Sequence, residues 1–273
     1  MVCDHLQASG DSVTKQWMEN YVKGVPSRGN KAPACRRALY RALGAFAPAP
    51  VDKTLDTLAV ARAGAASFSV ASLADAACSL VKSSYGDDKF TGILLLADFV
   101  LADKRPTAAQ VLETGAFLAR VAALFDSGAI SEWPSSDGMS MKVLGPFVLQ
   151  KPAGAARRDA ARAVLSWSAL TTGSVWRRRA GHVSFVNYIV RRGSKAGGAP
   201  KGDALLYPGF VSELIGACKH VCTSVCVCVY IGACARAGMC VNVWMRVCVY
   251  AHTVSARCTC ACVLEYRNNA GVD

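Results

Sequence analysis

Cysteine is scarce over most of this chain. Of the thirteen cysteines in 273 residues, only Cys3, Cys35 and Cys78 precede residue 218, and they lie far apart. This spacing argues against a disulfide framework and is typical of reduced, buried thiols in an intracellular protein. The opening residues also lack a basic segment followed by an apolar one, so we expect no secretory signal and a location in the nucleus or cytoplasm.

Long uncharged runs are missing as well. The longest, Val221 to Ala235, ends at Arg236, well short of the ~20 residues that a membrane helix needs. Residues 1–217 also lack a credible series of strands, because their apolar positions recur at three and four and not at two. We therefore expect an all-α protein with no membrane partner.

Acidic residues are outnumbered by basic ones. The chain has a formal net charge of +12 and a pI near 9.2, and the residues from Cys218 onward account for only +3 of that charge. A basic body indicates a polyanionic partner, because clustered Lys and Arg release condensed counterions when they meet phosphates. Nucleic acid is the first candidate and an acidic membrane surface the second; Lys151, Arg157, Arg158 and Arg162 could equally be solubilising charge.

The remaining pattern is one of short helices joined by Pro-, Gly- and Asn-rich connections. Ten helices with broad apolar faces suit helix pairs stacked side by side, as in HEAT-like or ARM-type repeats with a period of about 40 to 47 residues. No exact repeat is present, so a globular all-α domain is the alternative. We predict a HEAT-like helical-repeat solenoid in residues 1–217, with helices at 13–23, 34–47, 51–65, 69–84, 87–104, 106–126, 139–150, 156–170, 174–190 and 204–217.

Residues 218–273 belong to a different compositional class. Ten cysteines lie between Cys218 and Cys262, many alternating with Val or Ala. Zinc sites use C-x2-C to C-x4-C pairs, which the C-x-C steps of this tail do not supply. Repeated TG dinucleotides do encode alternating Cys and Val. We hypothesise that the tail is translated intron or an erroneous frame; uniform transcripts encoding it across this junction would contradict that.

Two short segments stand out from the alanine-rich background. SEWPSSDGMSM contains Trp133 and Asp137, and SVWRRRAGHVSF contains Trp176 followed by Arg177, Arg178 and Arg179. In a helix that starts at Pro134, Trp133 and Asp137 project from the same side of the first turn. Three consecutive arginines on a helix point in three directions, so at least one faces any groove that the helix lines.

These segments carry a resemblance. The order W-x3-D and then W-x-x-R-A, after YVKGV…GNKAP..R and DDKFTGILLLADFVL, resembles the HEAT-repeat DNA alkylation repair glycosylases, the AlkD-like family. The resemblance runs from about Trp17 to Val190. It implies that Asp137 is the catalytic carboxylate, that Trp133 lies against the damaged nucleotide, and that Arg179 grips the DNA backbone. Trp176, Arg177 and Arg178 are further DNA-binding candidates.

The same resemblance implies a reaction and a partner. The partner is duplex DNA with N3- or N7-alkylated purines, whose glycosidic bond is hydrolysed by a monomer without metal or other cofactor. An alkylated purine already carries positive charge, so it leaves as a neutral base and needs no strong general acid. A carboxylate near the developing oxocarbenium sugar and a positioned water are sufficient.

Simpler interpretations exist for each of these residues. Asp137 after two serines suits a helix cap, Trp133 and Trp176 suit core packing, and the arginines suit a solvated face. The family also carries a later aromatic, in a segment like G-W-V-L-R, that has no counterpart between Arg179 and Ala217, so the sequence leaves enzymatic activity of this chain open. A non-catalytic helical-repeat scaffold that binds nucleic acid or acidic proteins is the alternative function.

Overall fold

The computed structural model describes residues 1–48, 57–169, 174–189 and 202–221. Every regular element within these ranges is helical, and none of them contains a strand. The predicted all-α class is therefore confirmed. The predicted tail from residue 222 onward lies outside the described residues, whereas the last helix continues four residues past Ala217, to Val221.

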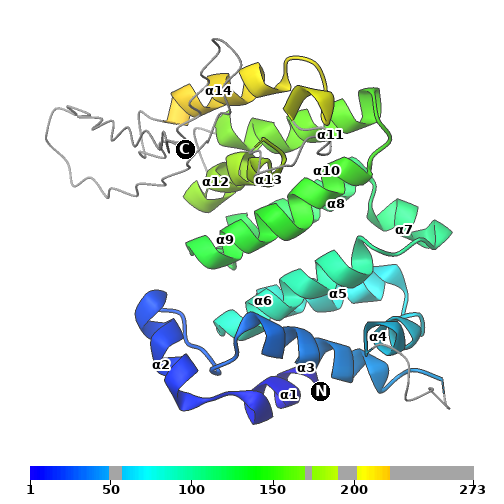
Figure 1. The fold of residues 1–273 in the computed structure, drawn as a ribbon, viewed down its shortest axis with the longest axis vertical. Coiled ribbons are helices and arrows are strands. Elements are labelled where there is room, and N and C mark those ends of the chain that lie inside the picture. Colours follow the sequence, from blue (N-terminus) through cyan, green and yellow to red (C-terminus); the bar gives the residue numbers. More distant parts are fainter. Residues whose placement is uncertain (49–56, 170–173, 190–201, 222–273) are drawn as a thin grey trace, which may run out of the picture.

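The helices follow one another from the N-terminal end of the molecule to α14 at the opposite end (Figure 1). Besides the α-helices there are two π-helical turns, η1 and η2, and two 3-10 turns, η3 and η4. In chain order they are α1 (Val2–Ser9), α2 (Ser12–Tyr21), α3 (Ala32–Gly44), α4 (Thr57–Ala65), α5 (Val70–Val81), α6 (Gly86–Leu95), η1 (Leu96–Val100), α7 (Pro106–Val111), α8 (Thr114–Asp126), α9 (Trp133–Met139), η2 (Ser140–Leu144), α10 (Gly145–Gln150), α11 (Ala155–Leu165), η3 (Ser166–Ala169), α12 (Val175–Val183), α13 (Val186–Ile189), η4 (Gly202–Ala204) and α14 (Phe210–Val221).

Neighbouring helices pack in pairs, and the pairs stack. Helix α3 packs against α4, α5 against α6, and α11 with η3 against α12. Four helices, α3, α6, α9 and α12, contact one another in that order and form a layer that runs through the stack (Figure 1). This arrangement is that of a helical-repeat solenoid, as predicted.

Helix ends differ from the sequence prediction at several places. Helix α1 was not predicted, the predicted helix 174–190 is divided between α12 and α13, and the predicted helix 139–150 is preceded by α9 and begins with the π-helical turn η2. The predicted helix 106–126 is two helices, because the Glu113 carboxylate accepts hydrogen bonds from the backbone N–H groups of Gly115 and Ala116 and starts α8 afresh. Helix α14 begins at Phe210 and not at residue 204, since Gly209 adopts a φ of 85° that a helix does not allow.

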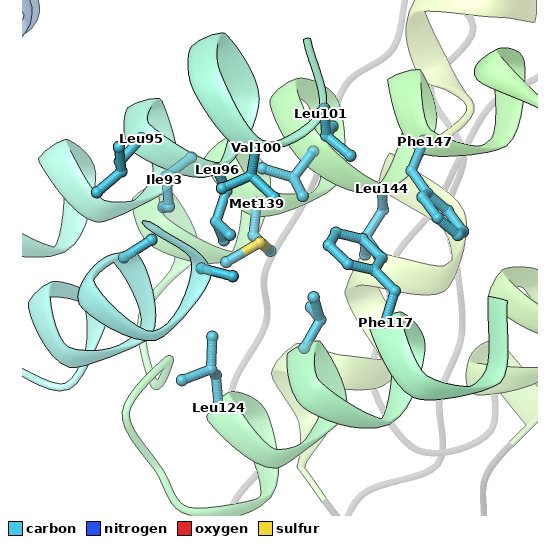
Figure 2. Packing of buried hydrophobic residues seen from close by; sticks show 14 of the residues in the cluster. Ile93, Leu95, Leu96, Val100, Leu101, Phe117, Leu124, Met139, Leu144 and Phe147 are labelled. Carbon is cyan, nitrogen blue, oxygen red and sulfur yellow. The ribbon is translucent and has the colours of Figure 1, made fainter. Parts of the chain in front are cut away.

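The core is continuous between the stacked pairs. Figure 2 shows Leu96 of η1 near Met139 of α9, and Phe117 of α8 near Leu144 of η2. Phe117 stacks on Phe147 of α10 with ring centroids 4.5 Å apart. Helices α5 and α6 approach so closely that a Cβ on Gly92 would lie 2.5 Å from the Ala77 carbonyl oxygen. Helix α9 contacts α6 on one side and α12 on the other.

The three early cysteines are free thiols; Cys35 and Cys78 are buried, as expected, whereas Cys3 is half-buried. Burial raises the pKa of Cys35 to about 12, so this thiol is an apolar core group and not a nucleophile. Within the described ranges no single helix has both the length and the hydropathy of a membrane span; only the bent pair α4 and α5 passes by length and composition.

Candidate functional site

Asp137 of α9 and Arg179 of α12 contact each other within the layer formed by α3, α6, α9 and α12. Nε of Arg179 donates to Oδ1 of Asp137 at 2.8 Å, and Nη2 donates to Oδ2 at 2.9 Å. The Arg179 side chain is only 9% exposed and the Asp137 side chain 15%. A planar guanidinium in this fork geometry fixes both oxygens of the carboxylate, so Asp137 is held in one orientation.

A second hydrogen bond, from the residue before Asp137, joins the two helices that carry this pair. The hydroxyl of Ser136 on α9 donates to the Trp176 carbonyl oxygen on α12 at 3.2 Å. Helix α12 starts where predicted, with the Ser174 side chain accepting from the Trp176 backbone N–H. The register of the two helices therefore brings together Asp137 and Arg179, which the sequence separates by 42 residues.

Trp133 lies one helical turn before Asp137 and is exposed. It begins α9, followed by Pro134 in the first turn as predicted. The Tyr21 ring of α2 contacts its indole edge-on, with centroids 5.3 Å apart, and Trp17 stacks on Tyr21 at 5.0 Å with nearly parallel planes. We call Trp17, Tyr21 and Trp133 the aromatic row. It extends outward from the turn that carries Asp137.

Exposed aromatic side chains concentrate in this row. Among the described residues four aromatic side chains are largely exposed, and three of them are Trp17, Tyr21 and Trp133, at 56%, 49% and 39%. The fourth, Phe46, packs on Phe68 at the end of α3. An apolar surface that is contiguous and drawn from two helices more than a hundred residues apart is typical of a binding site.

Helix α2 is held in place by the loop that follows it. The buried Asp87 carboxylate accepts hydrogen bonds from the Ser27 hydroxyl at 2.9 Å and from the backbone N–H groups of Arg28 and Asn30. The buried Asp88 carboxylate accepts from Nε and Nη2 of Arg28 at 2.9 and 3.1 Å. The first turn of α6 thus anchors the loop, and the loop fixes α2 beside α9.

The other predicted DNA-binding residues lie elsewhere. Arg177 points to the far side of α12, where it donates to Asp126 at 2.8 Å and lies over the Trp167 ring. Trp176 is half-buried against the core. Arg178 is half-buried, and its carbonyl oxygen lies 3.3 Å from Nδ1 of His182. The arginines do point in different directions, and Arg179 is the one that meets Asp137; DNA contacts by the others stay a prediction.

A buried acid lies just before Trp133. The Ser135 hydroxyl donates to Oε1 of Glu132, whereas Oε2 is buried without a hydrogen-bond partner among the described residues. Burial raises the pKa of Glu132, against the nearby positive charge of Lys89. Lys89 itself is buried and donates to the Ala129 carbonyl oxygen. These groups fix the segment that leads into α9.

Sequence reasoning missed the part of the site that α2 supplies. Trp17 and Tyr21 stand four residues apart and so share one helix face, but the same pattern also describes a core-facing stripe. Only the tertiary arrangement shows that this face meets Trp133 and solvent. In the part of the chain that the structure describes, no three His, Cys, Asp or Glu side chains are placed to hold a metal ion.

Comparisons with known proteins agree with this picture. A family model described as "DNA alkylation repair enzyme" matches residues 2–207, which include the whole aromatic row, Asp137 and Arg179. Comparison with curated proteins and with solved structures gave no match.

Proposed function

The chain belongs to the family of DNA alkylation repair enzymes, and on this premise we propose that it binds duplex DNA and hydrolyses the N-glycosidic bond of N3- or N7-alkylated purines. The single observation that supports the proposal is the pairing of Asp137 with Arg179 next to the exposed Trp133. An acid, a guanidinium and an aromatic surface adjoin one another there on a basic protein.

Asp137 takes the catalytic role in this proposal. As the glycosidic bond of an alkylated purine breaks, the base becomes neutral and positive charge moves to the sugar. A carboxylate held in place before the reaction stabilises that charge without reorganising. Asp137 also accepts a proton from a water molecule that attacks the sugar carbon, so the products are a free base and an abasic nucleotide.

Arg179 holds Asp137 and keeps donors for DNA. A guanidinium has five N–H groups, and the ion pair uses one on Nε and one on Nη2. The remaining three can donate to a phosphate oxygen next to the damaged nucleotide. Such a contact fixes the position of the strand without reading its sequence, as suits an enzyme that acts on lesions.

Trp133 and Tyr21 provide the surface for the damaged nucleotide. The face of an aromatic ring attracts a cation by its quadrupole, by ~0.5 to 2 kcal/mol. An alkylated purine carries such a charge and an unmodified purine does not. The exposed rings therefore favour the damaged nucleotide while Asp137 acts on its sugar.

The test is base release by the full chain from a duplex with one 7-methylguanine. Release that is lost in Asp137→Asn supports the glycosylase. Duplex binding without release, unchanged by that substitution, would instead support a non-catalytic scaffold. The same duplex with guanine is the control, because its neutral base lacks the charge that makes the leaving group good.

A further inference from the structure

We propose that Trp17 is a DNA-binding residue that stacks on a base beside the damaged nucleotide and gives the protein part of its preference for damaged duplex. The inference rests on the function proposed above. It extends the site from α9 and α12, which carry Asp137 and Arg179, to α2, a helix with no acid or guanidinium at the site.

Trp17 presents an open ring face. Its plane lies 12° from that of Tyr21 at a centroid distance of 5.0 Å, so one face of the indole is covered by the tyrosine. The residue is nonetheless 56% exposed. Only one face of each ring is covered in a stacked pair, and the other face of Trp17 is available to a planar ligand.

The ring is also fixed in position. Asp11 caps α2 by accepting from the Thr14 backbone N–H at 2.7 Å, and Glu19 accepts from the Ser27 backbone N–H at 3.1 Å. Ser27 is bound in turn by Asp87 of α6. Stacking on Tyr21 restricts the indole further, so little side-chain freedom is left to lose on binding.

The position of Trp17 in the aromatic row indicates what it contacts. Trp133 and Trp17 are separated by two ring steps, of 5.3 Å and 5.0 Å. A nucleotide whose sugar lies at Asp137 is within reach of Trp133 and Tyr21, so the neighbouring base is the one that meets Trp17. Stacking of this kind tolerates any base, because every base has a π-face. The preference for damage follows from position, because the neighbouring base reaches Trp17 when the cationic nucleotide is held at Trp133 and Tyr21.

The net positive charge attracts both DNA and an acidic protein surface, and the exposed ring of Trp17 favours DNA. A strand held by phosphate contacts to the basic body brings its bases to the row, whereas an acidic peptide offers no planar groups at this spacing. We therefore assign the open face of Trp17 to DNA, and a protein partner is an outcome that the experiment below can reveal.

The experiment compares two duplexes that differ at one base. One has a 7-methylguanine made resistant to hydrolysis by a 2′-fluoro sugar, and the other has guanine. Dissociation constants are measured for the full chain and for Trp17→Ala, Trp17→Phe and Gln16→Ala. Gln16 is the matched control because it lies on the same helix, is exposed and uncharged, and projects about 100° away from Trp17.

Trp17→Ala is expected to weaken binding to the damaged duplex by about fivefold or more. Trp17→Phe is expected to restore most of that affinity because it keeps a ring, and Gln16→Ala to have no effect. Equal weakening on both duplexes, or no weakening on the damaged one, would overturn the role of Trp17. Helical content and thermal unfolding of the variants check that α2 still folds.

Base release from ordinary 7-methylguanine, measured separately, distinguishes failure of the stacking role of Trp17 from failure of the proposed glycosylase activity. Release by the parent chain with no Trp17 effect on binding refutes the stacking role and leaves the glycosylase intact. A Trp17 effect on damaged-duplex binding without any release supports the stacking role and refutes the catalytic one. An acidic protein can also be added as a competitor. If it displaces both duplexes from the parent chain, and Trp17→Ala has no effect on duplex binding in its absence, this surface serves a protein partner.

Discussion

The guanidinium of Arg179 and the carboxylate of Asp137 form a bidentate ion pair that joins α12 to α9. The pair has a structural and a chemical consequence. It ties two stacked helices together, and it keeps a carboxylate in one orientation beside an exposed indole. Because both groups are largely withdrawn from water, neither can lose its partner without cost.

The first prediction concerns the stability that this pair provides. Replacing Arg179 by Ala leaves the Asp137 carboxylate buried and unpaired, so we expect the free energy of unfolding to fall by about 2 to 3 kcal/mol. Urea denaturation at neutral pH measures it. The control is Arg36→Ala, whose own side chain is 45% exposed and whose half-buried partner Asp98 keeps the Tyr40 hydroxyl as a donor, for which we expect about 0 to 1 kcal/mol. Equal losses in the two variants would contradict the structural role.

A second prediction concerns the anchor of α2. Asp87→Asn removes a charged acceptor from three N–H or O–H donors, and we expect a loss of about 2 kcal/mol. Because the anchored loop fixes α2, hydrogen exchange should also rise across Ser12–Tyr21. Asp98→Asn is the control. Destabilisation without faster exchange in α2 would show that Asp87 matters to the core alone.

The third prediction is a pH dependence of stability. Burial lowers the pKa of His182 from its ordinary value of 6.5. The unfolded chain therefore binds a proton near pH 6.5 that the folded chain binds only at lower pH. Stability is fully present above that value and declines as the pH falls through 6.5 toward the folded pKa. His182→Asn should flatten this part of the stability profile; an unchanged profile would rule out His182 as its source.

A fourth prediction concerns salt. If phosphate contacts dominate DNA binding, affinity for unmodified duplex should fall about a hundredfold between 50 and 200 mM salt. Fluorescence anisotropy of a labelled duplex measures the slope. A flat response would contradict DNA binding through phosphates and would instead point to a protein partner.

Much of the fold could be predicted from local patterns. The predicted helix starts at 87, at Pro134 and at 174 agree with α6, α9 and α12 to within one residue. Acids in a first turn, an early proline and a serine cap are signals that act within one turn. The break at Glu113 was missed. The sequence around it continues an apolar helical pattern, and only the side-chain cap interrupts it.

The candidate site could be predicted from the sequence only in part. Asp137 and Trp133 share a face because they are four residues apart, which sequence spacing reveals. Their meeting with Arg179 depends on helix register, and the contribution of Tyr21 depends on a loop anchored 60 residues away at Asp87. Such contacts are set by tertiary packing and leave no periodic signal in the sequence. The opposite directions of Arg177 and Arg179 follow from the ~100° turn per residue, but which of them faces Asp137 does not.

The most direct test of the central claim is the single-turnover rate of 7-methylguanine release by Asp137→Asn and by Asp103→Asn. Asp103 is the matched control, since it also binds an arginine, Arg105, through both carboxylate oxygens but lies between η1 and α7. We predict that Asp137→Asn slows release by about a hundredfold or more while Asp103→Asn stays near the parent rate. Equal rates for the two variants would contradict the assignment of Asp137 as the catalytic carboxylate.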